Sequence, residues 1–365
     1  MALAEALDSQ GQDKAALDWM VRSAQGGWLP AVSRLGLWQL VGHITPKAPA
    51  LGVARIVQAA QAGDPFGLHL AAILDAGAIG TPRNLGRALY WLARAAELGD
   101  GRAACQLGLL CGDEALSLSA LSAAAATGFE PALAALAGRD ATAWPTDWNA
   151  VASAADFSAF AAPISRVVES ESPRILSIPH LLAPGIGAYV MALAEPALGR
   201  GLVLTDDGSE QARAERSNRV MHFGLVDSDV ILELVNLRIA QAAEMPPENA
   251  EGLGVLHYAP GERYRPHMDY IPDTPENARQ LDVMGQRVRT LLVYLNDGFE
   301  GGATLFPRLE AAFRPPPGGA LIFDSVTEEG EMDGRTLHEG SPPTSGEKWV
   351  ISKWFRTKAL RPTAS

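Results

Sequence analysis

The first 140 residues carry apolar residues at helical spacing, interrupted at regular intervals by glycine. In the segment ALYWLARAAELG, one face of the helix would hold Leu89, Leu92, Ala95 and Ala96. Four similar segments lead into glycines spaced 36, 36 and 29 residues apart, namely Gly27, Gly63, Gly99 and Gly128. A period of this length is typical of a solenoid, in which helix–turn–helix units stack and bury a continuous core. We therefore predict an α-solenoid over residues 1–140.

Residues 173–360 show a different pattern. Two apolar segments, beginning near Pro184 and Ser228, predict helices. From Gly252 onward, short runs rich in β-branched and aromatic residues alternate with Gly, Pro, Asn and Asp, which predicts many short strands. This arrangement favours a jelly roll (double-stranded β-helix) with flanking helices. With residues 141–172 as a linker, we expect a two-domain α+β protein.

Composition narrows the possible functions. The chain has 365 residues, 47% of them hydrophobic, and a formal net charge of −12. Such acidity argues against non-specific binding of nucleic acid, which relies on basic patches. The two cysteines, Cys105 and Cys111, match no common zinc motif and are expected to be small buried residues. Neither a signal peptide nor a long apolar span is evident, so we expect a cytoplasmic protein that does not bind membranes.

The stretch YAPGERYRPHMD places two potential metal ligands two residues apart. In an extended strand, residues i and i+2 project to the same side, so the imidazole of His267 and the carboxylate of Asp269 would face one space. His338, in GRTLHEG, is a candidate third ligand. Two histidines and one carboxylate with open coordination positions are typical of non-haem Fe(II) oxygenases. Each of the three, taken alone, could also be an ordinary core or surface residue.

Ten residues after His338, Lys348 begins the apolar run KWVISKW. A lysine usually faces solvent. If this run is a strand, however, one of its faces carries Lys348, Val350, Ser352 and Trp354. A lysine on such a face can point into a barrel.

Several motifs, in their order and local spacing, resemble the prolyl 4-hydroxylase branch of the Fe(II)- and 2-oxoglutarate-dependent dioxygenases. They are GLGVLHYAPGERYRPHMD, RTLLVYLND, GGATLFP, PPPGGALIFD and LHEGSPPTSGEKWVISKWFR. The resemblance covers about half of the chain, from about Pro173 to Arg356. The unit LHLAAILDAGAIGTPRNLGRALYWLARAAELGDGRAA resembles a Sel1-like repeat, a relative of the tetratricopeptide repeat.

The resemblance implies a role for each candidate residue. The catalytic Fe(II) ligands would be His267, Asp269 and His338, with O2 as cosubstrate and L-ascorbate to rescue oxidised iron. The far carboxylate of 2-oxoglutarate would be anchored by Lys348, with hydroxyl partners Tyr258 and Thr304. The residues lining a peptide-substrate groove would be Glu251, Tyr264, Arg287 and Trp354. Core packing is the competing interpretation for the tyrosines, and a solvated strand position is the competing one for Arg287.

Three departures from the family pattern bear on the substrate rather than on the metal: Ala303 in GGAT, the segment EGSPPTSG, and Arg356 two residues after Trp354. The expected activity is hydroxylation of a prolyl residue of a protein or peptide, with release of succinate and CO2, and with the repeats recruiting that substrate. Two alternatives stay open. One is hydroxylation of a free amino acid or other small molecule, with the repeats only a scaffold. The other is a non-catalytic interaction or oxygen-sensing protein.

Overall fold

The computed structural model describes residues 1–136, 139, 146–201, 203–204, 210–211 and 216–363. The chain divides into two compact units. The first contains Met1–Phe157, Ser228–Leu234 and Arg361–Ser365, and the second contains Ser158–Asp227 and Val235–Leu360. The predicted linker begins at residues 141–145, which lie outside the described residues, and the predicted domain limits stay a prediction.

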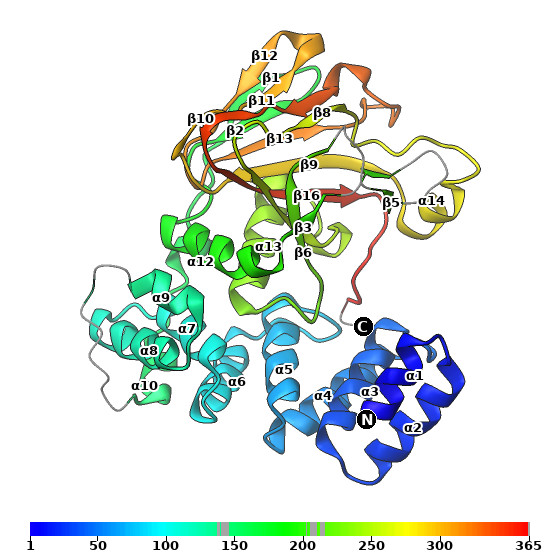
Figure 1. Cartoon of the computed structure of the whole chain (residues 1–365), viewed down its shortest axis with the longest axis vertical. Coiled ribbons are helices and arrows are strands. Elements are labelled where there is room, and N and C mark those ends of the chain that lie inside the picture. The colour runs from blue at the N-terminus through cyan, green and yellow to red at the C-terminus, as the bar shows by residue number, and fades with distance from the viewer. Residues whose placement is uncertain (137–138, 140–145, 202, 205–209, 212–215, 364–365) are drawn as a thin grey trace. The chain divides into compact units, whose positions relative to one another are not determined.

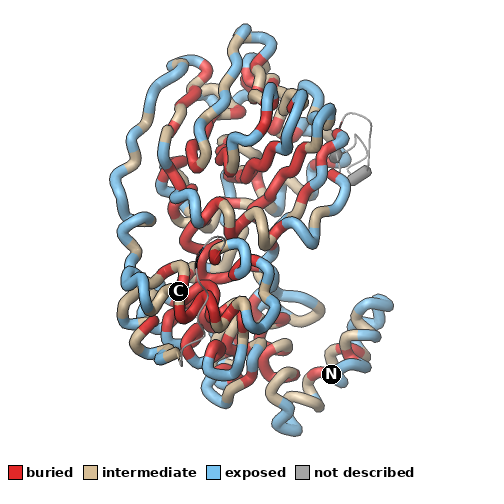
Figure 2. The backbone as a smooth tube through the Cα atoms, turned by 60° about the vertical axis from the view of Figure 1, so that its left-hand side comes forward, coloured by how far each residue is buried: buried red, intermediate tan, exposed pale blue. Residues whose placement is uncertain are grey.

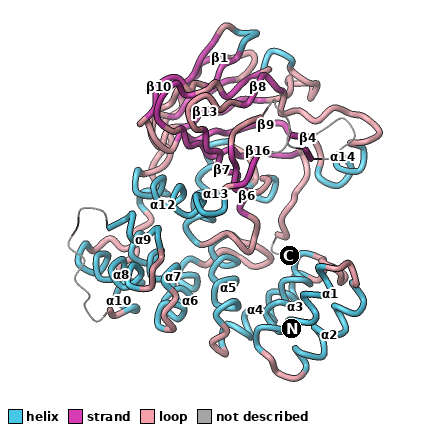
Figure 3. Tube along the Cα trace, in the orientation of Figure 1, coloured by secondary structure: helices cyan, strands magenta, loops and turns pink. Residues whose placement is uncertain are grey.

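The first unit is an α-solenoid, as its hydrophobic pattern predicts (Figure 1). Its described part contains helices and no named strand (Figure 3). Each of the first eight helices packs against the next in chain order, and the tenth packs against the sixth, seventh and eighth. The helices are α1 (Ala2–Ser9), α2 (Asp13–Gln25), α3 (Leu29–Val41), α4 (Pro49–Gln61), α5 (Pro65–Gly77), α6 (Leu85–Glu97), α7 (Gly101–Leu110), α8 (Glu114–Ala126), α9 (Glu130–Leu136) and α10 (Trp148–Ser153).

Each predicted repeat glycine lies in the turn between two paired helices. Gly27, Gly63, Gly99 and Gly128 have φ angles of 80°, 85°, 89° and 81°, a left-handed conformation that glycine adopts without steric cost. Asp64 and Asp100, which follow two of these glycines, cap the next helix by accepting hydrogen bonds from the backbone N–H groups of Gly67 and Ala103. The 36-residue period therefore reflects a recurring turn and cap.

The second unit contains a jelly roll of antiparallel strands (Figures 1 and 3). The larger sheet has the strand order β1 (Val167–Ser170), β2 (Ile175–Ile178), β13 (Ala320–Asp324), β9 (Arg287–Tyr294), β16 (Lys348–Arg356), β7 (Leu253–Tyr258), β6 (Arg219–Phe223) and β3 (Gly199–Arg200). The smaller sheet has the order β12 (Ala311–Phe313), β11 (Thr304–Phe306), β14 (His338–Gly340) and β8 (Tyr264–His267). Two further pairs are β10 (Phe299–Gly301) with β15 (Pro343–Gly346), and β4 (Val203–Leu204) with β5 (Glu210–Gln211).

Helices flank the sheets, as predicted. They are α11 (Ser158–Ala161), α12 (Pro184–Ala194), α13 (Val230–Ala243) and the short 3-10 segments Glu195–Ala197, Pro247–Asn249, Pro307–Leu309 and Gly334–Thr336. The side chain of Lys353 on β16 donates a hydrogen bond of 2.7 Å to Asn236, which fixes α13 to the outer face of the larger sheet. One further helix, α14 (Ala278–Met284), lies between β8 and β9. The sequence pattern did not indicate α14, because none of its residues is buried.

The core of the second unit lies between the two sheets. The larger sheet contributes buried apolar residues such as Leu256, Leu292 and Val350, and Phe306 contributes from the smaller sheet. Figure 2 marks buried residues in red throughout the chain, and most residues of β7, β9, β13 and β16 are buried. His338, the first residue of β14, and Asp269, which comes after β8, are both buried.

Candidate active site and its metal centre

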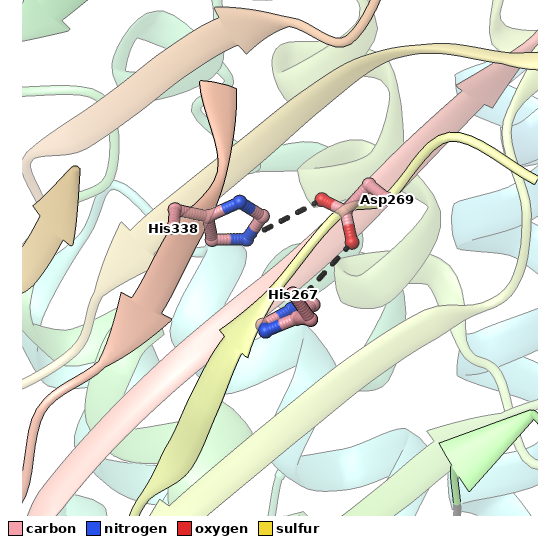
Figure 4. A group of neighbouring side chains, drawn as sticks. All are labelled: His267, Asp269 and His338. Atoms are coloured by element: carbon pink, nitrogen blue, oxygen red, sulfur yellow. Dashed lines mark ion pairs between the residues drawn. The ribbon is translucent and has the colours of Figure 1, made fainter. Parts of the chain in front are cut away.

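Three of the predicted site residues lie together at the end of the smaller sheet (Figure 4). His267 on β8 and His338 on β14 are register partners, and Asp269 lies two residues beyond the end of β8. One ligand atom of each residue lies within 4.8 Å of those of the other two. The Nε2 atoms of His267 and His338 lie 3.8 and 3.6 Å from the two carboxylate oxygens of Asp269. The arrangement presents two imidazole nitrogens and one carboxylate to a common point.

Further contacts hold each of these side chains in place. The Nδ1–H group of His267 can donate to the carbonyl of Arg265 at 2.8 Å, and that of His338 to the carbonyl of Thr336 at 3.0 Å. These contacts leave each Nε2 free to bind a metal. Thr290 on β9 donates a hydrogen bond of 2.6 Å to Oδ2 of Asp269. Such outer contacts orient metal ligands and set their basicity.

The electrostatics of His267 and Asp269 suit metal binding. Burial, together with the neighbouring His338, lowers the pKa of His267 to about 3. Burial alone would raise the pKa of Asp269, but the nearby histidines and Arg287 hold it below its usual value. At neutral pH, His267 is therefore neutral and Asp269 is ionised, the forms that bind a divalent metal. Imidazole nitrogens together with one anionic carboxylate oxygen fit Fe(II).

Lys348, the predicted anchor for 2-oxoglutarate, is a buried lysine. Its side chain is 2% exposed, and its Nζ atom lies 4.8 Å from the ring centre of Tyr258 and 5.0 Å from that of Tyr294. Burial, followed by the positive charge of Arg314, lowers the pKa of Lys348 to about 7. Among the described residues no carboxylate forms an ion pair with this ammonium, so a dicarboxylate ligand such as 2-oxoglutarate fits it.

Thr304 lines the same pocket as Lys348, and the turn that precedes Thr304 approaches Lys348 closely. Gly302 has a φ of 67°, and a Cβ atom there would lie 2.7 Å from the ring of Phe299 and 3.3 Å from the side chain of Lys348. The hydroxyl of Thr304 is hydrogen-bonded at 2.8 Å to that of Tyr294. Sequence reasoning did not single out Tyr294, since an aromatic residue in an apolar strand is typical of any core.

The metal ligands and Lys348 line one pocket. Its walls are Arg216, Leu256, Tyr258, Tyr264, His267, Asp269, Leu292, Thr304, His338, Gly340, Lys348, Val350, Ser352 and Trp354. The alternate residues of β16 that sequence reasoning assigned to one face all belong to this list. Tyr258 is buried, and this burial raises the pKa of its phenol.

Tyr264 packs directly on a metal ligand. Its ring is stacked on that of His267, with 3.5 Å between ring centres and 14° between planes. The guanidinium of Arg216 lies 4.6 Å from the same tyrosine ring. Arg216 is buried and pairs with Tyr264 through an isolated β-bridge. Sequence reasoning missed Arg216, because nothing in the polar segment around it indicates this pairing.

Glu251 and Arg287, predicted to line a substrate groove, do not line the pocket. Arg287 donates two hydrogen bonds, of 2.6 and 2.8 Å, to the carboxylate of Glu251. The guanidinium of Arg287 also stacks 4.0 Å from the ring centre of Trp354, which does line the pocket. Arg287 is thus not a solvated strand residue, and the groove role of this pair stays a prediction.

Comparisons with known proteins agree with this chemistry. The family model described as the 2OG-Fe(II) oxygenase superfamily matches residues 253–356. Prolyl 4-hydroxylase 1 of Arabidopsis thaliana is 35% identical over 207 residues, which cover 53% of this chain and 72% of that protein. Prolyl 4-hydroxylase subunit alpha-1 of Rattus norvegicus is 31% identical over 202 residues, which cover 54% of this chain and 37% of that protein.

Solved structures give weaker likenesses. A viral collagen prolyl hydroxylase from Paramecium Bursaria Chlorella virus-1 is 24% identical, covers 49% of this chain and 94% of that chain, and has a TM-score of 0.38. A Sel1 repeat protein from Oxalobacter formigenes is 23% identical, covers 40% of this chain and 69% of that chain, and has a TM-score of 0.33. TM-scores this low support no inference on their own.

The fold and the site together define an iron-dependent oxygenase of the jelly-roll class. The chain belongs to the 2OG-Fe(II) oxygenase superfamily and, within it, to the family of the prolyl 4-hydroxylases. It is therefore a 2-oxoglutarate-dependent dioxygenase that uses Fe(II), 2-oxoglutarate and O2, with helical repeats at its N-terminal end.

Proposed function

We propose that this enzyme hydroxylates a prolyl residue in a protein or peptide and converts 2-oxoglutarate to succinate and CO2. The observation that carries the proposal is the single pocket that contains His267, Asp269, His338 and Lys348. The identity of 35% with a prolyl 4-hydroxylase favours proline over other substrates. Two aromatic side chains, Tyr264 and Trp354, line the same pocket and add apolar surface that a pyrrolidine ring can contact.

The residues have distinct tasks in this reaction. The two histidines and Asp269 hold the iron, which, with 2-oxoglutarate bound, supplies the activation of O2 for C–H hydroxylation. Lys348 holds the far carboxylate of 2-oxoglutarate through a charge-assisted hydrogen bond, and Tyr258 and Thr304 offer hydroxyl groups beside it. The apolar walls, such as Leu256 and Val350, exclude water from the reacting groups.

The test is aerobic release of succinate by the purified chain with Fe(II) and 2-oxoglutarate, with and without proline-rich peptides. We expect the peptides to stimulate release and to gain one oxygen on proline by mass spectrometry. His267→Ala should abolish both signals, whereas His222→Ala, at an exposed histidine on β6, should not. Stimulation by free amino acids but not by peptides would favour a small-molecule hydroxylase. Release no higher than in His267→Ala with every substrate, despite bound iron, would favour a non-catalytic protein.

We further propose that the repeats recruit the protein substrate; the alternative is a scaffold. Several large apolar side chains on the repeats are exposed, including Trp28 at 57% and Tyr90 at 51%. Deleting the repeats is a poor test, because it would remove partners of residues at the start of α13. Asp229 forms an ion pair with Arg102 of α7, and the backbone N–H of Val230 donates a hydrogen bond to the side chain of Gln106 of α7. Instead, Trp28→Ala with Tyr90→Ala should raise the KM for a long proline-rich polypeptide and leave that for a short peptide unchanged. An unchanged KM for both substrates would favour a scaffold.

Two expectations concern the setting of the enzyme. We propose that the enzyme is cytoplasmic. We also propose that L-ascorbate rescues oxidised iron; succinate release should then decline over successive turnovers when ascorbate is left out. In the described part of the chain, no helix combines the length and the apolar character that crossing a membrane requires.

A further inference from the structure

The chain makes a long excursion immediately after the metal ligand Asp269. Having left the smaller sheet after His267, it forms α14 with no buried residue, and returns to the larger sheet at Arg287, the first residue of β9. A ligand at the start of an exposed loop would be poorly fixed, because an unconstrained loop costs conformational entropy to order. Some contact must therefore hold the chain close to Asp269.

The side chain of Gln286 provides this contact, because it links the two ends of the excursion. Its Oε1 atom accepts a hydrogen bond of 2.8 Å from the backbone N–H of Ile271, and its Nε2 atom donates one of 2.7 Å to the carbonyl of the same residue. Ile271 is 2% exposed and lies two residues after Asp269. One side-chain amide thus satisfies both backbone groups of Ile271, as a neighbouring strand would.

Gln286 is itself held firmly. Its backbone N–H donates to the hydroxyl of Thr357 at 3.0 Å, and its carbonyl accepts from the N–H of Thr357 at 2.9 Å. Its Oε1 atom also accepts the N–H of Arg287 at 2.8 Å. These bonds leave the amide plane little freedom, so the position of Ile271 follows that of β9 and β16.

Strand β9, which follows Gln286, also contacts the side chain of Asp269. Thr290 on this strand donates a hydrogen bond of 2.6 Å to Oδ2 of Asp269. Thr290 therefore holds the side chain of the ligand, and Gln286 holds the main chain beyond it. We propose that Gln286 is a positioning residue for Asp269, which sets the affinity of the metal centre without touching the metal. This role concerns the metal centre alone and does not depend on which substrate is hydroxylated.

A matched control lies in the same excursion. The side chain of Asn277 is buried and donates a hydrogen bond of 3.0 Å to the carbonyl of Pro272. This bond closes a turn within the excursion and, in the described structure, does not reach β9. Replacing Asn277 loosens the excursion without releasing Ile271 from Gln286. The two positions therefore separate the positioning of Asp269 from the general stability of the loop.

The experiment measures the binding of Mn(II) alone to the full chain by electron paramagnetic resonance, with Co(II) absorption as a second readout of ligand geometry. Gln286→Met keeps the length of the side chain and removes both hydrogen bonds to Ile271, together with the one that Gln286 Oε1 accepts from the N–H of Arg287. We expect it to weaken Mn(II) binding by roughly tenfold, the lower end for outer contacts of metal ligands, and to change the Co(II) spectrum. Asn277→Leu should bind Mn(II) within about twofold of the wild type.

Two results would overturn the proposal: unchanged Mn(II) affinity in Gln286→Met, or an equal loss of affinity in Asn277→Leu. If Gln286→Met is insoluble, Gln286→Glu replaces it under the same criteria. The glutamate keeps the acceptor for the Ile271 N–H group and loses the donor to its carbonyl. Circular dichroism at the assay temperature confirms that each variant is folded.

Discussion

The affinity of the enzyme for 2-oxoglutarate should fall as the pH rises above neutrality. The cause is Lys348, whose Nζ atom lies between the rings of Tyr258 and Tyr294 and whose pKa is lowered to about 7 in the ligand-free protein. Below this pH the lysine is already charged and ready for a carboxylate. Above it, the free enzyme must take up a proton for each molecule of 2-oxoglutarate that binds.

The size of the effect follows from linkage. While the bound complex keeps Lys348 protonated, the apparent Kd scales with the inverse of the protonated fraction of the free lysine. With a pKa of about 7, half of the lysine is charged at pH 7 and about one-hundredth at pH 9, so the Kd should rise roughly 50-fold over that range. Below pH 6 it should be nearly constant, because the lysine is fully protonated.

The assay is calorimetric titration of 2-oxoglutarate into the Mn(II)-loaded protein without oxygen, from pH 6 to 9. Two buffers with different ionisation enthalpies give the proton uptake, expected to be about one half at pH 7 and close to one at pH 8.5. Lys348→Arg is the control, because its guanidinium stays charged throughout this range. A Kd that does not change with pH in the wild type would refute the reasoning, as would an equal slope in Lys348→Arg.

Three further predictions test other parts of the molecule. Thr290→Val removes the hydrogen bond to Asp269 and should weaken Mn(II) binding about 10- to 100-fold; an unchanged affinity would show that this bond is dispensable. Lys348→Met should stabilise the ligand-free protein against urea at pH 7 by up to about 4 kcal/mol, because lowering the pKa from 10.5 to about 7 penalises the charged lysine. The gain should shrink toward pH 10.5, where the lysine is neutral, and a constant gain would exclude this cause. Asp75→Asn, which removes the ion pair between the buried Asp75 carboxylate and the half-exposed Arg87, should lower the free energy of unfolding by about 2 kcal/mol without affecting metal affinity.

Features that depend on local spacing were predictable from the sequence. The repeat period was visible because each helical pair needs a left-handed residue in its turn, and Gly27, Gly63 and Gly99 supply it every 36 residues. The close approach of His267 to Asp269 follows from residues two apart at the end of a strand. In each case the information lies within one element and its period, so no knowledge of tertiary contacts is needed.

Features that depend on contacts between distant segments were not predictable in this way. Arg216 reaches the ring of Tyr264 across 48 residues of sequence, and Gln286 reaches Ile271 only after the chain has formed α14 and returned. A glutamine before a strand or an arginine in a polar segment is ordinary, and its partner depends on how the sheets are aligned. The contacts of such residues can be identified only when the strand register is known.

The cluster around Glu251 shows why register changes the interpretation. Arg287 on β9 and Arg356 on β16 are direct register partners, and two like charges opposite each other destabilise a sheet. Glu251 offsets this repulsion by accepting hydrogen bonds from both guanidinium groups, at 2.6 and 2.5 Å. Burial alone would raise the pKa of Glu251, but the two arginines hold it below its usual value, so the glutamate stays charged. From the sequence, Arg356 was an isolated departure from the family pattern; in the structure it ties up one oxygen of Glu251. A substrate would have to compete with this buried ion pair to bind Glu251, whereas Trp354, stacked on Arg287, already faces the pocket.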